Sequence, residues 1–152
     1  IRERITLEND DKTFTALETL EVAEQVGVPM VLDIHHDQVN PSEQPAIELW
    51  PRILRTWEGL TEQRQADGTA AAPLPPKIHV SSPKSDKDPR GHADYIESSI
   101  LMAFLRAIAA ETPALDIMLE AKMKDDALMK LMLAVRDEPD VLIKTQAAFE
   151  LQ

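Results

Sequence analysis

Short apolar runs alternate along the chain with longer segments in which apolar residues recur at helical spacing. The short runs predict strands, and they cover 4–9, 30–32, 77–81 and 116–120. The helical spacing predicts helices over 17–26, 42–57, 97–110 and 125–136. Thr13 or Thr15 predicts the start of the first helix and Gly27 its end, while Ser42 predicts the start of the second. The segment 141–151 is apolar enough to pack, but its pattern leaves its type open.

A strand followed by a helix, repeated along the whole chain, predicts an α/β fold with a parallel sheet and right-handed crossovers. A complete TIM-type (βα)8 barrel needs about 250 residues. The 152 residues therefore fit one domain, 1–152, with about four βα units, which is either half of such a barrel or an open sheet. Two polar stretches interrupt the pattern. The first, 58–76, predicts an exposed loop, and the second, 81–94, predicts a long polar loop.

Polar residues with useful chemistry fall at the carboxyl ends of the predicted strands. Glu8 ends the first strand, and Asp33 follows the second with His36 three residues later. His79 lies in the third strand and Glu120 ends the fourth. Barrel enzymes carry their catalytic groups at this end of the strands. The repeated position favours the half barrel over the open sheet, and it predicts that these side chains meet in one pocket.

Composition excludes several classes of protein. An excess of 27 Asp and Glu over 16 Lys and Arg gives a net charge of -11, which repels phosphate and argues against unaided binding to nucleic acid or anionic membranes. The absence of cysteine excludes disulfides and thiol chemistry, and scattered single glycines exclude a phosphate-binding loop. No run approaches the roughly 20 apolar residues of a membrane span. We therefore expect no membrane partner and a cytoplasmic or nuclear location.

Carboxylates and imidazoles on one rim suit a divalent ion such as Mn²⁺ or Zn²⁺, because oxygen donors and neutral nitrogen donors can share one coordination shell. Simpler interpretations exist for each residue. Glu8, beside Asn9, is also compatible with a solvated turn. Asp33 and His36 are also compatible with a helix cap and a loop histidine, and His79 with a satisfied core histidine. The metal hypothesis therefore depends on whether these side chains converge.

Glu120 follows an apolar run, where burial of an unpaired carboxylate is costly. It therefore needs either a cation or an ion pair with Lys122 or Lys124. The loop 81–84 places two hydroxyl groups and an ammonium group close to the third predicted strand, which is compatible with phosphate contact or with an ordinary polar loop. Its candidate substrate contacts are Ser81, Ser82 and Lys84.

Five stretches, taken together and in this order, resemble the carboxyl half of the UV damage endonuclease family. They are LENDD at 7–11, MVLDIHH at 30–36, PKIHVSSPK at 76–84, HADY at 92–95 and MLEAK at 118–122. The resemblance implies a TIM-type barrel that binds a cluster of divalent ions, commonly Mn²⁺, with Zn²⁺ or Mg²⁺ as alternatives. It also implies a partner, damaged double-stranded DNA, which the family nicks on the 5′ side of ultraviolet photoproducts.

The resemblance also implies roles for individual residues. Lys77 matches a lysine that the family places at the metal cluster, where it can carry a carboxyl modification, so it is the expected catalytic group. Asp37 departs from the family, in which a third histidine is common here, and the choice of His36 therefore rests on the Asp-x-x-His spacing. The implied metal ligands are Glu8, Asp33, His36, His79, His92 and Glu120.

The family's first barrel strands, with further histidine ligands and the residues that probe the lesion, have no counterpart in this sequence. We therefore expect an incomplete catalytic unit whose exposed strand edges and helix faces need the amino-terminal half of the barrel or a second copy. Two other functions stay open: a metal-dependent sugar isomerase or epimerase on a similar barrel, and a non-catalytic half-barrel fragment. The loop 81–84 and His92 favour the endonuclease.

Overall fold

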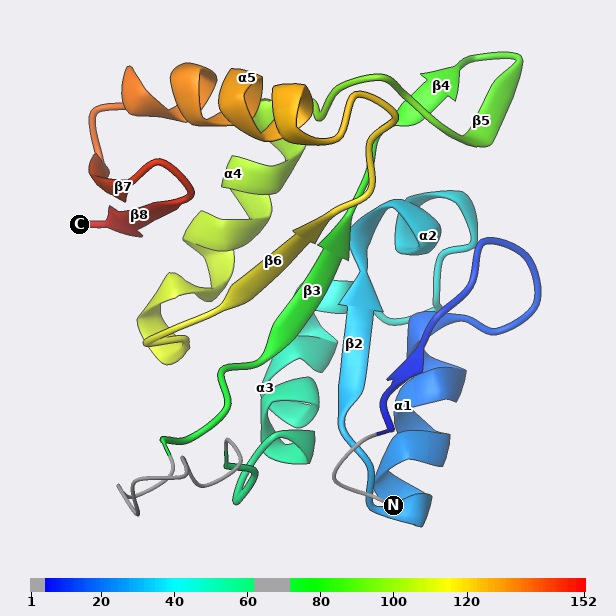
Figure 1. The fold of residues 1–152 in the computed structure, drawn as a ribbon. Helices are drawn as coiled ribbons and strands as arrows, with labels where there is room; N and C mark the ends of the chain where they lie inside the picture. Colours follow the sequence, from blue (N-terminus) through cyan, green and yellow to red (C-terminus); the bar gives the residue numbers. More distant parts are fainter. Residues whose placement is uncertain (1–4, 62–71) are drawn as a thin grey trace.

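The computed structural model describes residues 5–61 and 72–152 (Figure 1). Part of the predicted exposed loop, 58–76, therefore lies outside the described residues. The regular elements, in chain order, are β1 (Leu7–Glu8), α1 (Ala16–Val26), β2 (Met30–Asp33), α2 (Ile34–Val39), α3 (Ala46–Thr56), β3 (Lys77–Val80), β4 (Pro83–Ser85), β5 (Asp88–His92), α4 (Ser98–Ile108), the 3-10 turn η2 (Ala109–Glu111), β6 (Asp116–Leu119), α5 (Asp125–Arg136), β7 (Val141–Thr145) and β8 (Ala148–Leu151).

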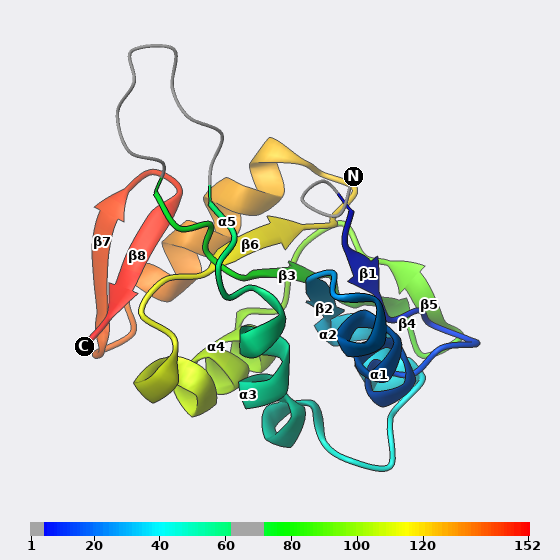
Figure 2. The same cartoon turned by 90° about the horizontal axis from the view of Figure 1, so that it is seen from below.

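Four parallel strands form one sheet in the order β1-β2-β3-β6, so that each strand pairs with the next sheet strand along the chain. Helices α1, α3 and α4 lie together on one face of this sheet (Figures 1 and 2). All four strands were predicted from the apolar runs, and the structure confirms an α/β fold with a parallel sheet. The constant direction of the crossovers keeps the helices on one side of the sheet.

The strand register divides the side chains between the two faces of the sheet. Leu32 pairs with Ile78 across β2 and β3, and both are fully buried in the core beneath the helices. Asp33 pairs with His79 at the next position, so both side chains point to the opposite face. This alternation places apolar residues toward the helices and the titratable residues on the other face.

Two tryptophans, Trp50 in α3 and Trp57 directly after it, hold α3 against α4 and the sheet. Trp50 is fully buried against Phe104 of α4, with ring centroids 5.6 Å apart, and its Nε1 donates to Oγ1 of Thr112 at 2.8 Å. Trp57 donates from Nε1 to the carbonyl oxygen of Met30 at 2.7 Å. Both indole groups thus bury a large apolar surface while their single donor is satisfied, which is the usual condition for burial of tryptophan.

The helix boundaries agree with the sequence where capping residues determine them. Thr15 and Glu18 form a reciprocal capping box at the start of α1, and Gly27 ends the helix with a φ of 68°. The prediction for α3 was wrong at its start: the helix begins at Ala46 after Pro45, and the hydroxyl of Ser42 instead accepts a hydrogen bond from the backbone of α1. The short α2 was not predicted, because six residues are too few for a periodic pattern.

Two segments fold as antiparallel hairpins. The predicted polar loop 81–94 contains β4 and β5, which the sequence did not reveal because their side chains are mostly exposed and lack apolar alternation. The segment 141–151 forms the hairpin β7–β8, which packs against the end of the helix layer. Within the described ranges, no helix combines the length and apolar character needed to cross a membrane.

Candidate metal centre

Side chains from all four sheet strands converge at the carboxyl edge of the sheet. Glu8 lies at the end of β1, Asp33 at the end of β2 and His79 in β3, and one ligand atom of each lies within 4.8 Å of the others. Glu120 follows β6 and places Oε1 3.4 Å from Nδ1 of His79. Parallel strands end on the same edge, which is why residues so distant in sequence meet here.

The imidazole of His79 lies at the centre of this cluster. Its Nδ1 donates to Oε1 of Glu8 at 3.1 Å, and Oε1 of Glu120 lies 3.4 Å from the same nitrogen. The hydrogen bond to Glu8 is the largest cause that raises the pKa of His79, against the opposing effect of burial. The cluster thus gathers several carboxylates around an imidazole whose pKa they raise.

Asp33 is the most constrained carboxylate of the cluster. It is fully buried, and its Oδ1 accepts a hydrogen bond of 2.8 Å from the backbone of His36 at the start of α2. Its Oδ2 is also buried and has no hydrogen-bond partner among the described residues. Burial raises the pKa of Asp33 and outweighs the hydrogen bond from His36, which lowers it. A buried carboxylate oxygen without a donor is costly, so this position is suited to a cation.

The ring of His36 is oriented by a backbone carbonyl. Its Nδ1 lies 2.9 Å from the carbonyl oxygen of Asn9 and 3.8 Å from both Oε1 of Glu8 and Oδ2 of Asp33. Because a carbonyl oxygen only accepts, Nδ1 carries the hydrogen and Nε2 keeps a free lone pair. Metal-binding histidines commonly show this arrangement, in which one ring nitrogen donates to a carbonyl and fixes the tautomer.

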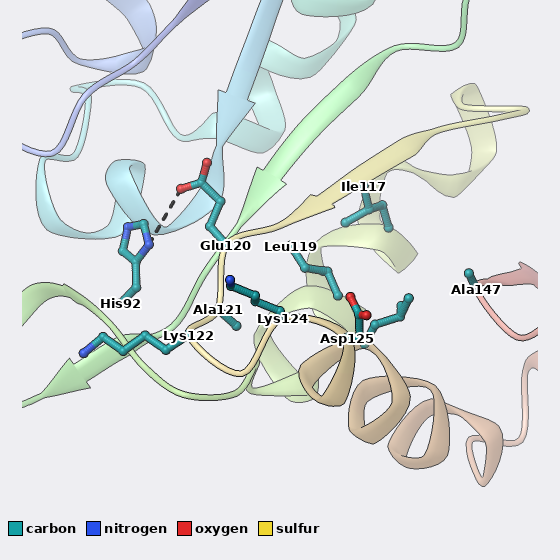
Figure 3. Close-up of a pocket in the computed structure, with 10 residues that line it drawn as sticks. His92, Ile117, Leu119, Glu120, Ala121, Lys122, Lys124, Asp125 and Ala147 are labelled. Atoms are coloured by element: carbon teal, nitrogen blue, oxygen red, sulfur yellow. Dashed lines mark ion pairs between the residues drawn. The ribbon is translucent and has the colours of Figure 1, made fainter.

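A cavity of about 580 Å³ borders the cluster on the side of β6 and α5 (Figure 3). Glu120 and His92 point toward each other at its edge, with Oε2 and Nδ1 3.7 Å apart. Lys122 and Lys124 line the same cavity, but within 4.0 Å the carboxylate of Glu120 meets only His79 and His92 among the described residues. The alternative that Glu120 pairs with one of these lysines is therefore wrong.

Comparison with known proteins identifies the family of this chain. The family model described as UV-endonuclease UvdE matches residues 1–150. The chain belongs to this family. Two proteins named UV DNA damage endonuclease, from Bacillus velezensis and Bacillus pumilus, are 41% and 43% identical over 133 residues. The match covers 87% of this chain and 38% of each relative, so the chain spans less than two fifths of their length.

A solved structure supports the fold independently of the sequence. The crystal structure of SacUVDE matches with a TM-score of 0.65 at 24% sequence identity, over 89% of this chain and 40% of that one. At this identity the likeness shows the fold, an α/β arrangement with a parallel sheet. The side chains described above therefore converge at the strand ends of a parallel sheet that this chain shares with SacUVDE.

The structure gives the predicted substrate contacts different surroundings. Ser81 and Ser82 are both buried, and their hydroxyl groups have internal partners, the ring of His35 and the backbone of Glu97. Neither hydroxyl is free at the surface in this structure, and a role of these serines toward a substrate stays a prediction. Lys84 is half exposed on the β4–β5 hairpin, where its Nζ lies 3.1 Å from Oδ2 of Asp88. Its role toward a substrate stays a prediction.

Lys77 lies on the same face of β3 as His79, two residues toward the amino end of the strand. It lines a second cavity, beside Asp116 and Met118 of β6. Among the described residues its ammonium group forms no ion pair with the carboxylates of the cluster. Its predicted catalytic role is thus compatible with its face of the sheet, while the structure brings together the six predicted ligands, Glu8, Asp33, His36, His79, His92 and Glu120, without it.

Asn9 belongs to the site but was not singled out from the sequence. It is 1% exposed, its Nδ2 donates to the carbonyl oxygen of Asp33 at 3.0 Å, and its Oδ1 accepts from the backbone nitrogen of Asp33 at 2.9 Å. With the bond from His36 to its own carbonyl, Asn9 joins the ends of β1 and β2. Its position directly after Glu8 was the available signal.

We expect Asn9→Ala to lower the free energy of unfolding by about 2 to 4 kcal/mol, because it leaves two buried backbone groups of Asp33 without partners. Urea unfolding followed by circular dichroism measures this change. Asn40→Ala is the matched control, since Asn40 donates a single, less buried hydrogen bond, to the carbonyl oxygen of Asp10 at 3.1 Å. Equal losses in the two variants would contradict the special role of Asn9.

Proposed function

We propose that this chain is the metal-binding segment of a DNA repair endonuclease that nicks double-stranded DNA on the 5′ side of ultraviolet photoproducts. The observation that carries the proposal is the convergence of carboxylates and imidazoles at the ends of four strands, where Oδ2 of Asp33 is buried with no hydrogen-bond partner in the described part of the chain. Membership in the UvdE family and the names of the Bacillus relatives support the DNA substrate. The net charge of -11 is compatible with DNA only if cations offset it, which a metal centre provides.

The donor set fits a cluster of divalent ions, and we assign Mn²⁺ as its preferred occupant over Zn²⁺ or Mg²⁺. Mixed carboxylate and imidazole ligands suit Mn²⁺, whereas Mg²⁺ is usually bound by oxygen alone. When bound, such ions supply charge neutralisation at the scissile phosphate and a nucleophilic water at neutral pH. The ligands in this proposal are Glu8, Asp33, His36, His79, His92 and Glu120.

The residues of the chain have separate tasks in this proposal. The hydrogen bond from Nδ1 of His36 to Asn9 keeps Nε2 of the ring available as a donor to a cation. Release of the proton from His79 frees its Nδ1 for the same purpose. Lys84, exposed on the β4–β5 hairpin, contacts a phosphate of the DNA backbone. Lys77, on the same face of the sheet as His79, is the catalytic group.

We further propose that the domain, 1–152, is half of a TIM-type barrel. The consecutive strand order and the helices on one face support this arrangement, because a barrel adds its strands in one direction around a ring. Met118 supports it as well, since 47% of this large apolar residue is exposed on the face of β6 opposite the helices. A complementary half would cover this face and complete the catalytic unit.

The decisive experiment measures Mn²⁺ binding and incision together. We expect isothermal calorimetry to detect Mn²⁺ binding by the chain, while incision of irradiated duplex by the chain alone is absent or very weak. Addition of the part of the Bacillus pumilus relative outside the 133 matched residues should restore incision at photoproducts, with unirradiated duplex as the control. Absence of Mn²⁺ binding would overturn the metal centre, and robust incision by the chain alone would overturn the half-barrel proposal.

A further inference from the structure

His35 lies in α2 directly before His36 and is fully buried. Its Nε2 is 2.7 Å from the carbonyl oxygen of Pro89 in β5, and its Nδ1 is 2.5 Å from Oγ of Ser81 after β3. Three segments that are distant in sequence therefore meet at one imidazole ring. None of the metal-binding tasks assigned above uses this histidine.

The partners of His35 fix its tautomer. The carbonyl oxygen of Pro89 can only accept, so Nε2 carries the hydrogen. Nδ1 then accepts from the hydroxyl group of Ser81, which donates. Both ring nitrogens are satisfied by neutral groups, as burial of a polar side chain requires. The lone pair of Nδ1 accepts the hydrogen bond from Ser81 and is therefore not available to a metal ion. In this respect His35 differs from the histidines of the cluster.

The bond to Pro89 holds the β4–β5 hairpin against the end of the sheet. His92 lies in the same short strand as Pro89, and its ring is 5.7 Å from the ring of His35 in an edge-on arrangement. Nδ1 of His92 is in turn 3.7 Å from Oε2 of Glu120. Movement of β5 away from α2 would therefore carry His92 away from the cluster.

We propose that His35 is a positioning residue that holds the β4–β5 hairpin in the register in which His92 reaches the metal centre. The role of His35 in placing His92 rests on the metal centre proposed above, but the contact between His35 and the hairpin does not depend on any ion. A second contact of the hairpin, from Nε of Arg90 to the carbonyl oxygen of Asp11 at 3.0 Å, is exposed and does not pass through His35. It supplies the matched control.

The first part of the test uses the metal-free chain. We expect ¹⁵N spectra of the imidazole groups to show hydrogen on Nε2 of His35. In His35→Leu, hydrogen exchange of the hairpin amides, 84–92, should accelerate about tenfold or more, while His35→Gln, whose side-chain amide can still donate to Pro89, should restore slow exchange. Arg90→Ala should change this exchange much less. Hydrogen on Nδ1, or unchanged exchange in His35→Leu, would overturn the proposal.

The second part follows paramagnetic broadening of histidine ring protons during titration with Mn²⁺, which is well resolved because the chain has only four histidines. In the wild type we expect His36, His79 and His92 to broaden together. In His35→Leu the broadening of His92 should require about ten times more Mn²⁺ or more, the range typical for outer-shell partners, while His36 and His79 broaden as before. His35→Gln should recover the wild-type order.

Identical broadening of His92 in the wild type and His35→Leu would overturn the positioning role. Broadening of no histidine in the wild type would overturn the metal centre instead, and hydrogen exchange of the metal-free hairpin would still decide the role of His35. If His35→Leu does not fold, Ser81→Ala tests the orientation of the same ring, because it removes the hydroxyl group that donates to Nδ1 and leaves the ring free to turn away from Pro89. In that variant we expect the same selective loss at His92, and its absence would count against the proposal.

Discussion

Replacement of Asp33 by asparagine is expected to weaken Mn²⁺ binding by about 100-fold or more, while the metal-free chain keeps or gains stability. The loss should exceed that for outer-shell partners, which is about 10- to 100-fold, because a direct ligand loses its charge. The stability should not fall, because asparagine can still accept the hydrogen bond from the backbone of His36 and removes a buried charge whose Oδ2 has no partner within 5–61 and 72–152. Calorimetry with Mn²⁺ and urea unfolding without metal measure the two effects.

Asp116→Asn is the matched control for this change. Asp116 begins β6 on the same face of the sheet, but it is exposed and lies at the opposite end of the strand, paired in register with Lys77. The control should leave Mn²⁺ affinity unchanged. If Asp33→Asn bound Mn²⁺ normally, or if it lost affinity only together with a loss of folding, Asp33 would be a structural cap of α2 and not a ligand.

The second large effect is a pH dependence of opposite sign in two quantities: the stability of the metal-free chain and its affinity for Mn²⁺. The pKa of His79 is raised in the folded state, so its contribution to stability is fully present below the unfolded pKa of about 6.5 and is lost as pH rises through the folded pKa. Binding of Mn²⁺ requires the neutral imidazole, so affinity should rise by up to about tenfold per pH unit over the same range. Metal-free stability should therefore fall above about pH 6.5 while Mn²⁺ affinity increases.

Urea unfolding and Mn²⁺ titrations at intervals from pH 6 to 9 would measure both slopes. Glu8→Gln provides the control for the metal-free slope, because the hydrogen bond that His79 donates to Glu8 is the largest cause of the raised pKa of His79. That variant should lose most of the decline in stability. A metal-free stability that rises with pH in this range, or a slope that survives in Glu8→Gln, would contradict the raised pKa of His79 and its assignment to Glu8.

The parts of the fold that local sequence determines were predicted correctly. Thr15 and Gly27 mark the ends of α1 through their own capping groups and backbone preferences, and the apolar run before Asp33 is enough to predict β2. The β4–β5 hairpin could not be predicted, because its exposed side chains carry no pattern that distinguishes a strand from a loop. Its position depends on contacts with other segments, including the contact between His35 and Pro89.

The residues of the candidate site also fall into those that the sequence predicts and those that it does not. Glu8, His79 and Glu120 could be found because they occupy equivalent positions at the ends of strands, and the parallel sheet converts that equivalence into proximity. Asn9 and His35 were not found, because their importance lies in partners 24 and 54 residues away that only the folded chain brings within reach. Sequence spacing thus predicts which groups meet at an edge, and the tertiary contacts determine what orients them.

The consecutive strand order also determines the order in which the site can assemble during synthesis of the chain. Each strand of the sheet pairs with the next one synthesised, so the sheet can grow one unit at a time as the chain emerges. Glu8 and Asp33 come together first, and their mutual repulsion is relieved when β3 brings in His79. Glu120 arrives last, after β6 has docked on β3. Nascent chains that end before residue 116 should therefore hold an open sheet edge and an unfinished set of ligands.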